Sequence, residues 1–145
     1  DIDREHQNYM DIADEMDREE KELEIFDNLP CGAALYEFDG EHIKILNINK
    51  RFEEITERKA NSCNGELRSI TYMHPEDRET VMLEVRNAAS EGRDGACTAR
   101  ILCGDNTYRE FYMEIRIKKQ EYGKYLLYVT YIPVSAKMKK IIGVN

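Results

Sequence analysis

Long apolar runs are absent from this chain: none of its segments approaches the 18 consecutive hydrophobic residues that a membrane-spanning helix requires. The sequence begins at Asp1 with neither an initiator methionine nor a basic-then-apolar leader, which we interpret as the start of a piece of a longer protein. The 145 residues, 41% hydrophobic and 34% charged, suit one soluble domain with a core and one appended element. We expect a cytoplasmic location and no membrane segment in this chain.

Clustered metal ligands and catalytic signatures are also missing. No two cysteines have Cys-x-x-Cys spacing and the three histidines lie far apart, which argues against a zinc site. We interpret the cysteines as small buried hydrophobes in a reducing cytoplasm rather than as disulfide or metal ligands. They are Cys31, Cys63, Cys97 and Cys103. The chain contains no Gly-x-Ser-x-Gly, no phosphate-binding loop and no His-Glu-x-x-His, so we expect no enzyme activity and no metal.

Negative charge is concentrated at one end of the chain. Residues 1–28 hold twelve acidic residues against only Arg4, Arg18 and Lys21, a net charge of −9, whereas the remaining residues carry +1. A nearly neutral body without a basic stripe argues against nucleic-acid binding.

The acidic segment 1–28 has the periodicity of an amphipathic helix. Apolar residues recur every seven positions, two of them with a further apolar residue three positions on, while Glu5 and Glu19 occupy the other two such positions. This half-filled heptad is near the lower limit for a coiled coil. Two interpretations stay open: a helix that packs only on its own sheet, or one that also pairs with a second copy through a short contact. The dimer-helix candidates are Ile2, Tyr9, Ile12, Met16, Leu23 and Phe26.

Three β-runs close the chain, at Ala96–Cys103, Thr107–Lys118 and Lys124–Val134. Both faces of the last run are largely apolar, whereas a half-exposed antiparallel strand alternates apolar with polar residues. One face is therefore expected to pack on the domain's own helices. The other needs an apolar cover, which the segment around Met16, Leu23 and Phe26 can supply.

A well-defined helix start precedes these strands at His74-Pro75-Glu76-Asp77-Arg78. Pro75 suits the first helical position, and Glu76 with Asp77 places negative charge at the positive end of the helix dipole. We expect Asp77 to accept hydrogen bonds from first-turn N–H groups, and Gly92 to end the helix.

The order of these elements resembles the PAS family of sensory domains over roughly residues 29–134. A hairpin, Ala33–Phe38 and Ile43–Ile48, turns at Asp39-Gly40, and the helix Asn49–Thr56 follows it. The turn Gly104–Arg109 is similar to the family's Asp-Gly-Ser-Tyr-Arg turn, with Asn106 where Gly is usual. The resemblance implies an α+β fold: a five-stranded antiparallel sheet with crossover helices on one face and the N-terminal amphipathic helix on the other.

The resemblance also implies a ligand pocket between the inner sheet face and the crossover helices. Each residue that could line it is equally an ordinary core residue. The candidates are Leu35, Ile45, Phe52, Ile55, Val85, Phe111, Met113 and Val129. Flavin is rejected, because Cys63 is not in the family's Asn-Cys-Arg-Phe-Leu-Gln run. Haem is disfavoured, because His74 is the nearest candidate ligand and stands where it would cap the helix instead. The cofactor, if one is bound, is left unidentified.

The function implied by the resemblance is that of a non-catalytic sensory or signal-relay module of a bacterial signalling protein. It would sense an unidentified small molecule, or relay conformation through its flanking helices, as a homodimer attached to an effector of the diguanylate cyclase or histidine kinase type. Residues 135–145 would start the linker to that effector, with Lys137, Lys139 and Lys140 approaching Glu19–Glu24. Two alternatives are a ligand-free dimerisation or protein-interaction module and a small α+β enzyme. A real cavity with convergent polar groups would favour sensing, a collapsed core the interaction module, and a deep cleft with a paired acid and base the enzyme.

Overall fold

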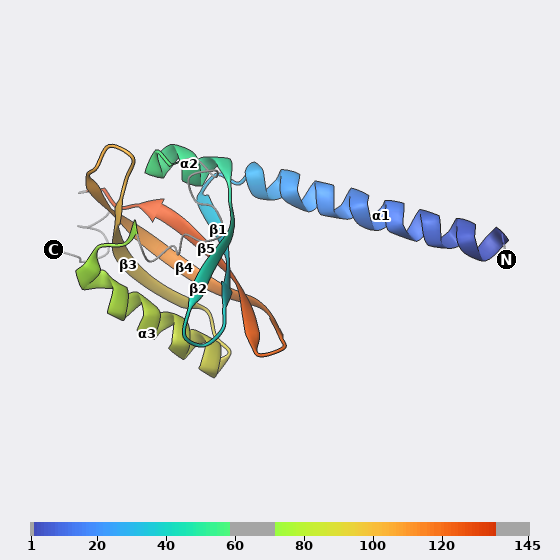
Figure 1. Cartoon of the computed structure of the whole chain (residues 1–145). Coiled ribbons are helices and arrows are strands. Elements are labelled where there is room, and N and C mark those ends of the chain that lie inside the picture. The colour runs from blue at the N-terminus through green and yellow to red at the C-terminus, as the bar shows by residue number, and fades with distance from the viewer. Residues whose placement is uncertain (1, 59–71, 136–145) are drawn as a thin grey trace.

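The computed structural model describes residues 2–58 and 72–135 (Figure 1). The Gly65 loop, Cys63 and the basic trio after Ser135 therefore lie outside the described residues. The elements in chain order are α1 (Ile2–Asp27), β1 (Gly32–Phe38), β2 (Ile43–Ile48), α2 (Lys50–Thr56), α3 (Pro75–Glu91), β3 (Gly95–Leu102), β4 (Tyr108–Glu121) and β5 (Lys124–Pro133).

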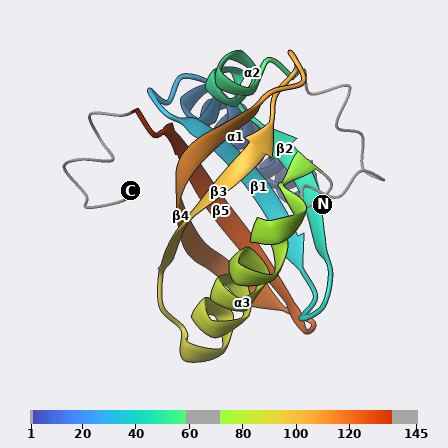
Figure 2. The ribbon, with the colours of Figure 1, turned by 90° about the vertical axis from the view of Figure 1, so that its left-hand side faces the viewer.

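The strands form one antiparallel sheet in the order β2-β1-β5-β4-β3, which confirms the expected α+β class. The last strand in the sequence therefore lies at the centre of the sheet, beside the first. α3 packs along β3 on one side of the sheet, and α1 lies on the opposite side, receding behind the sheet in Figure 2. We call the side of α3 the inner face and the other side the outer face.

The hydrophobic core lies between the inner face and α2 and α3. Alternate residues of the central strands point into it, because successive side chains of a strand face opposite ways. Phe52 of α2 and Val81 and Val85 of α3 close it from the helix side. The strand residues of this core with the least exposure are Ala34, Tyr36, Phe38, Ala99, Phe111, Met113, Ile115, Leu127, Val129 and Tyr131.

The ends of α3 follow the sequence prediction. The His74 imidazole Nδ1 accepts a hydrogen bond from the backbone N–H of Glu76 at 3.1 Å, so His74 is the N-cap, and Pro75 occupies the first turn. Gly92 ends the helix in the left-handed conformation with φ of 64°, a region that glycine enters without steric cost.

Asp77 has a different role from the one expected. Its carboxylate accepts three hydrogen bonds from Arg100 of β3: from the backbone N–H at 2.8 Å, from Nε at 3.0 Å and from Nη2 at 2.9 Å. The side-chain hydrogen bond from Arg100 is the main reason why the pKa of Asp77 lies below its ordinary value of 3.8. Asp77 therefore joins the start of α3 to the edge strand β3, and His74 is the residue that caps the helix.

We expect Asp77→Asn to lower the free energy of unfolding by about 2 kcal/mol at neutral pH, because charge-assisted hydrogen bonds are stronger than neutral ones. The folded pKa lies below the unfolded one, so this stabilisation is complete above the unfolded pKa and is lost as the pH falls through the folded pKa. Urea unfolding of both proteins should show a constant gap above the ordinary pKa of 3.8 and a gap that closes as the pH falls below it. A gap that stays constant below this pKa would contradict the role assigned to the carboxylate.

Two turns refine the expectations from sequence. The hairpin β1–β2 turns where predicted, but through the four residues 39–42 instead of two, because the Asp39 carboxylate accepts hydrogen bonds from the N–H groups of Glu41 and His42. In the β3–β4 turn, Asn106 has φ of 65°, as its tolerance of positive φ predicts.

The N-terminal helix departs most from expectation. Every described side chain from Asp3 to Ile25 is exposed, and α1 projects away from the domain (Figure 1). Only Phe26, at the base of the helix, is buried; its ring packs against Tyr128 of β5 with centroids 6.2 Å apart. The expected cover for the outer face is therefore supplied by Phe26 and not by Met16 or Leu23, because the helix axis leaves the sheet instead of lying across it.

Candidate functional site

The inner core holds most of the predicted pocket residues, and within residues 2–58 and 72–135 they pack together as a closed core. Ile55 is partly buried against the others. The buried members are Ile45, Phe52, Val85, Phe111, Met113 and Val129. The cavity found among the described residues here, lined by Tyr36, Met113 and their neighbours, has a volume of about 20 Å³. That volume is close to the minimum that holds one water molecule.

Two tyrosines provide the polar groups of this core. The hydroxyl groups of Tyr36 and Tyr131 are hydrogen-bonded to each other at 2.5 Å, and both rings are almost completely buried. Burial raises the pKa of Tyr131 well above its ordinary value, and the neighbouring Tyr36 adds to this effect. Tyr131 therefore stays neutral, and one hydroxyl donates to the other inside an apolar environment.

Leu35 was wrongly predicted to line the inner pocket. It is half-buried on the outer face, where it borders a small groove with Leu23 and Phe26 of α1. Its neighbours Ala34 and Tyr36 point into the inner core, so the alternation along β1 places Leu35 on the other face. A register shift between Leu35 and Tyr36 in the pairing with β2 accompanies this arrangement.

The candidates for the dimer helix share one stripe of α1, which the domain leaves uncovered. Tyr9 is 80% exposed and Met16 64% exposed, and Ile12 and Leu23 are also exposed. Phe26, the last member, is the one that packs on the domain. The Ile2 side chain lies outside the described part.

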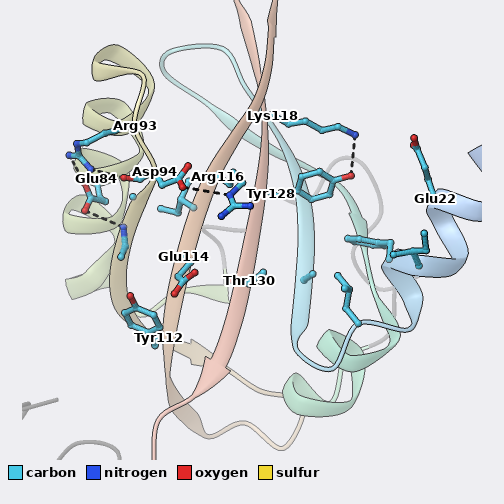
Figure 3. Close-up of a pocket in the computed structure, with 17 residues that line it drawn as sticks. Glu22, Glu84, Arg93, Asp94, Tyr112, Glu114, Arg116, Lys118, Tyr128 and Thr130 are labelled. Carbon is cyan, nitrogen blue, oxygen red and sulfur yellow. Dashed lines mark hydrogen bonds and ion pairs between the residues drawn. The ribbon is translucent and has the colours of Figure 1, made fainter. Parts of the chain in front are cut away.

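A groove of about 830 Å³ lies on the outer face, between the base of α1 and the turn from α3 to β3 (Figure 3). Its apolar end is formed by Ile25, Phe26 and Leu29, and its floor includes Tyr112 of β4 and Tyr128 of β5. Its volume exceeds that of the small groove beside Leu35 and of the inner cavity. Of its lining residues, Phe26 was predicted as part of the dimer helix, and the others were not predicted to form a site. The apolar outer residues of the last strand were the signal for it.

The charged groups of the groove are largely paired with one another. Arg93 contacts Glu84 at 2.9 Å, and Arg116 lies 3.6 Å from Asp94. The Lys118 ammonium donates to the Tyr128 hydroxyl at 3.3 Å (Figure 3). The groove thus combines an apolar end with a rim of mixed charge, which is typical of protein contact surfaces more than of a site for one charged ligand.

Asn49 is a second feature that the list of candidates missed. It is the N-cap of α2 and is 0% exposed, and its side chain joins α1, the loop before β1, β1 and α2. The sequence placed Asn49 at the start of the predicted helix Asn49–Thr56, where an Asn favours an N-cap. Its contacts to α1 depend on tertiary structure and carry no sequence signal.

The groups considered for metal, haem or redox chemistry have structural roles among the described residues. Burial raises the pKa of the Cys97 thiol to about 11, so it stays protonated, and burial also raises the pKa of Cys103. His74 caps α3 and lies against the Tyr108 ring at 4.7 Å between centroids. Within residues 2–58 and 72–135, no three His, Cys, Asp or Glu side chains converge as metal ligands.

No helix in the described part of the chain combines the length and apolar character needed to cross a membrane. No protein-family model and no curated protein matches the sequence.

Several solved structures have the same arrangement of strands and helices as this chain. The crystal structure of a Rhodobacter sphaeroides LOV protein superposes with a TM-score of 0.68 at 12% identity, covering 81% of this chain and 67% of that one. A PAS domain from Colwellia psychrerythraea gives 0.66 at 16% identity, covering 79% of this chain and 95% of that domain. The chain has the PAS fold. The PAS-B domain of Drosophila melanogaster Cycle, in a W398A form with bound glycerol, is similar too, at 19% identity and a TM-score of 0.59, with 70% of this chain and 99% of that one covered.

With the fold known, the inner and outer faces of the sheet can be compared with what the sequence resemblance implied. The inner core is the region for which the resemblance implied a ligand, and here its described part is filled by side chains. Among the described residues, the α1 stripe and the outer groove are surfaces that the domain leaves uncovered. At these identities the likeness concerns the fold, and the absence of flavin remains a prediction from the sequence motif.

Proposed function

We propose that this chain is a non-catalytic signal-relay module that works as a homodimer. It passes conformational changes between α1 and the sheet to a covalently attached effector. The effector type implied by the sequence resemblance is a diguanylate cyclase or a histidine kinase of a bacterial signalling protein. The observation that carries the proposal is a contrast: the described part of the inner core is closed, whereas the projecting helix carries an uncovered apolar stripe.

The closed core favours relay over ligand sensing. A pocket for a metabolite is usually several hundred Å³ in volume, far larger than the 20 Å³ among the described core residues. The polar groups that converge there, the Tyr36 and Tyr131 hydroxyls, are hydrogen-bonded to each other. A collapsed core was the outcome expected of an interaction module. The proposal therefore puts dimerisation ahead of ligand sensing.

The projecting helix favours a second copy as its partner. α1 is 26 residues long, and a helix with so many like charges gains little stability in water without packing. A second copy supplies the same stripe, which is the condition for a two-fold symmetric contact. The many acidic residues on both sides of the stripe oppose a long parallel pairing of two α1 helices. We therefore expect a short helix–helix contact near Met16 and Leu23, and we expect the outer face of the sheet to extend this interface.

Sedimentation velocity tests this proposal. The full chain is expected to form a weak or moderate homodimer, and deletion of residues 1–22 is expected to weaken it. Met16→Gln should shift the equilibrium towards monomer, because Met16 lies in the stripe. Met10→Gln is the matched control: Met10 is 50% exposed but lies 100° or more around the helix from Tyr9 and Met16.

A monomer at high micromolar concentration, with or without the deletion, would overturn the dimer. Equal effects of the two glutamine variants would show that the stripe is not the contact. Denaturing extraction and mass spectrometry of natively purified protein is the check on the closed core. Release of a small molecule in stoichiometric amount on denaturation would contradict the closed core and would favour ligand sensing as the function.

A further inference from the structure

The attachment of α1 to the domain depends on few contacts. The ring of Phe26 packs on Tyr128 on the outer face, and the Phe26 carbonyl accepts a hydrogen bond from the Asn49 side-chain amide at 3.0 Å. Carbonyls at the end of a helix lack intrahelical partners and need an external donor. Asn49 supplies that donor from 23 residues further along the chain.

The Asn49 side chain uses its complete hydrogen-bonding capacity. Its nitrogen donates to the carbonyls of Phe26 and Cys31, both at 3.0 Å. Its oxygen accepts from the N–H groups of Ala33 and Phe52, both at 2.9 Å. A side-chain amide has two donors and two main acceptor positions, so no position is left for water, and the group is 0% exposed.

Each of these four bonds reaches a different part of the chain. They hold the last turn of α1, the loop before β1, the start of β1 and the first turn of α2. α2 in turn reaches the core, because the Phe52 ring packs edge-on against Tyr131 with centroids 5.0 Å apart. A rotation of α1 about its base must therefore change the Phe26 bond to Asn49 or carry Asn49 and α2 with it.

We propose that Asn49 is the positioning residue that couples the orientation of α1 to α2 and the core. The inference rests on the proposed relay through α1 and names the residue through which that relay passes. The two donors hold α1 and the loop after it, whereas the two acceptors hold the domain. Removing only the donors should uncouple the helix without unfolding the domain.

Hydrogen exchange of the full chain, read peptide by peptide, separates these roles. Asn49→Asp keeps the two acceptor positions and remains a good helix N-cap, but an ionised carboxylate cannot donate to Phe26 or Cys31. Thr56→Val is the matched control in α2: it removes the hydrogen bond from the Thr56 hydroxyl to the Phe52 carbonyl, at 2.6 Å, without touching α1. Protection of α3 provides the internal reference for any global loss of stability.

In Asn49→Asp, amides in the last two turns of α1 should exchange about tenfold faster relative to α3, the change expected for one lost hydrogen bond. In Thr56→Val, α2 should lose protection while α1 keeps it. If Asn49→Asp does not fold, Asn49→Ser gives the same comparison, because its hydroxyl is too short to reach both carbonyls.

Loss of protection that is uniform over α1 and α3 would overturn the proposal, because it would mean that Asn49 only stabilises the fold. So would a selective loss in α1 that Thr56→Val reproduces. The sedimentation experiment reports separately on the dimer, so a monomeric chain with selective loosening of α1 would reject the proposed relay and retain the coupling.

Discussion

Gly104→Ala is expected to destabilise the domain by about 3 kcal/mol or more, the upper range for overpacking in a site that cannot relax. The backbone N–H of Gly104 donates to the Thr56 carbonyl at 2.8 Å, which brings the β3–β4 turn against the end of α2. A Cβ at this position would overlap the carbonyl oxygen of Glu57, a backbone atom that no side-chain rotation can remove. The turn would have to separate from α2 to accept it.

Gly40→Ala is the matched control for this prediction. Gly40 has φ of 101°, but a Cβ added to it meets no atom within 4 Å. Its substitution should cost about 1 kcal/mol, because only the backbone conformation opposes it. Urea unfolding of the three proteins measures both effects. Similar losses for the two variants would show that the contact between the turn and α2 is looser than the structure gives.

Phe111→Ala is expected to cost about 4 kcal/mol, the typical loss for a large aromatic side chain removed from a core. Phe111 is 0% exposed at the inner face of β4, and its ring lies edge-on to Tyr131 with centroids 6.4 Å apart. Phe111→Leu, which keeps most of the volume, should cost about 1 kcal/mol. Thermal and urea unfolding provide the measurement.

The same variant tests whether the inner core is closed. The alanine substitution should create an apolar cavity, so a small aromatic compound such as indole should raise the melting temperature of Phe111→Ala. Indole should have no effect on the unsubstituted chain. Stabilisation of the unsubstituted chain by indole would show that the core opens readily, and would argue against the closed core on which the proposed relay depends.

The sequence predicted elements and caps well because these are local features. Pro75 and Gly92 bracket α3 at the positions where φ and the missing N–H matter, and Asn106 takes the positive φ that its side chain tolerates. Phe111 and Met113 of β4, two of the predicted pocket residues, lie in the inner core. Each of these conclusions depends on a few neighbouring residues.

The errors arose where partners come from distant parts of the chain. The stripe on α1 predicts that something covers it, but not whether that is the chain's own sheet or another molecule, and the helix leaves the sheet after Phe26. Asp77 was predicted to cap α3 because its actual partner, Arg100, is 23 residues away in the sequence and gives no local signal. Pocket and core residues are of the same types, so the sequence could not show that the inner face is filled.

The position of β5 at the centre of the sheet has a consequence for synthesis. β5 pairs with β1 on one edge and β4 on the other, so the hairpin β1–β2 and the pair β3–β4 remain separate ribbons until the last strand leaves the ribosome. Neither ribbon has a core of its own, and a two-stranded ribbon is marginally stable in water. The domain is therefore expected to fold after its translation is complete, and nascent chains that stop before Lys124 should be substrates for chaperones and proteases.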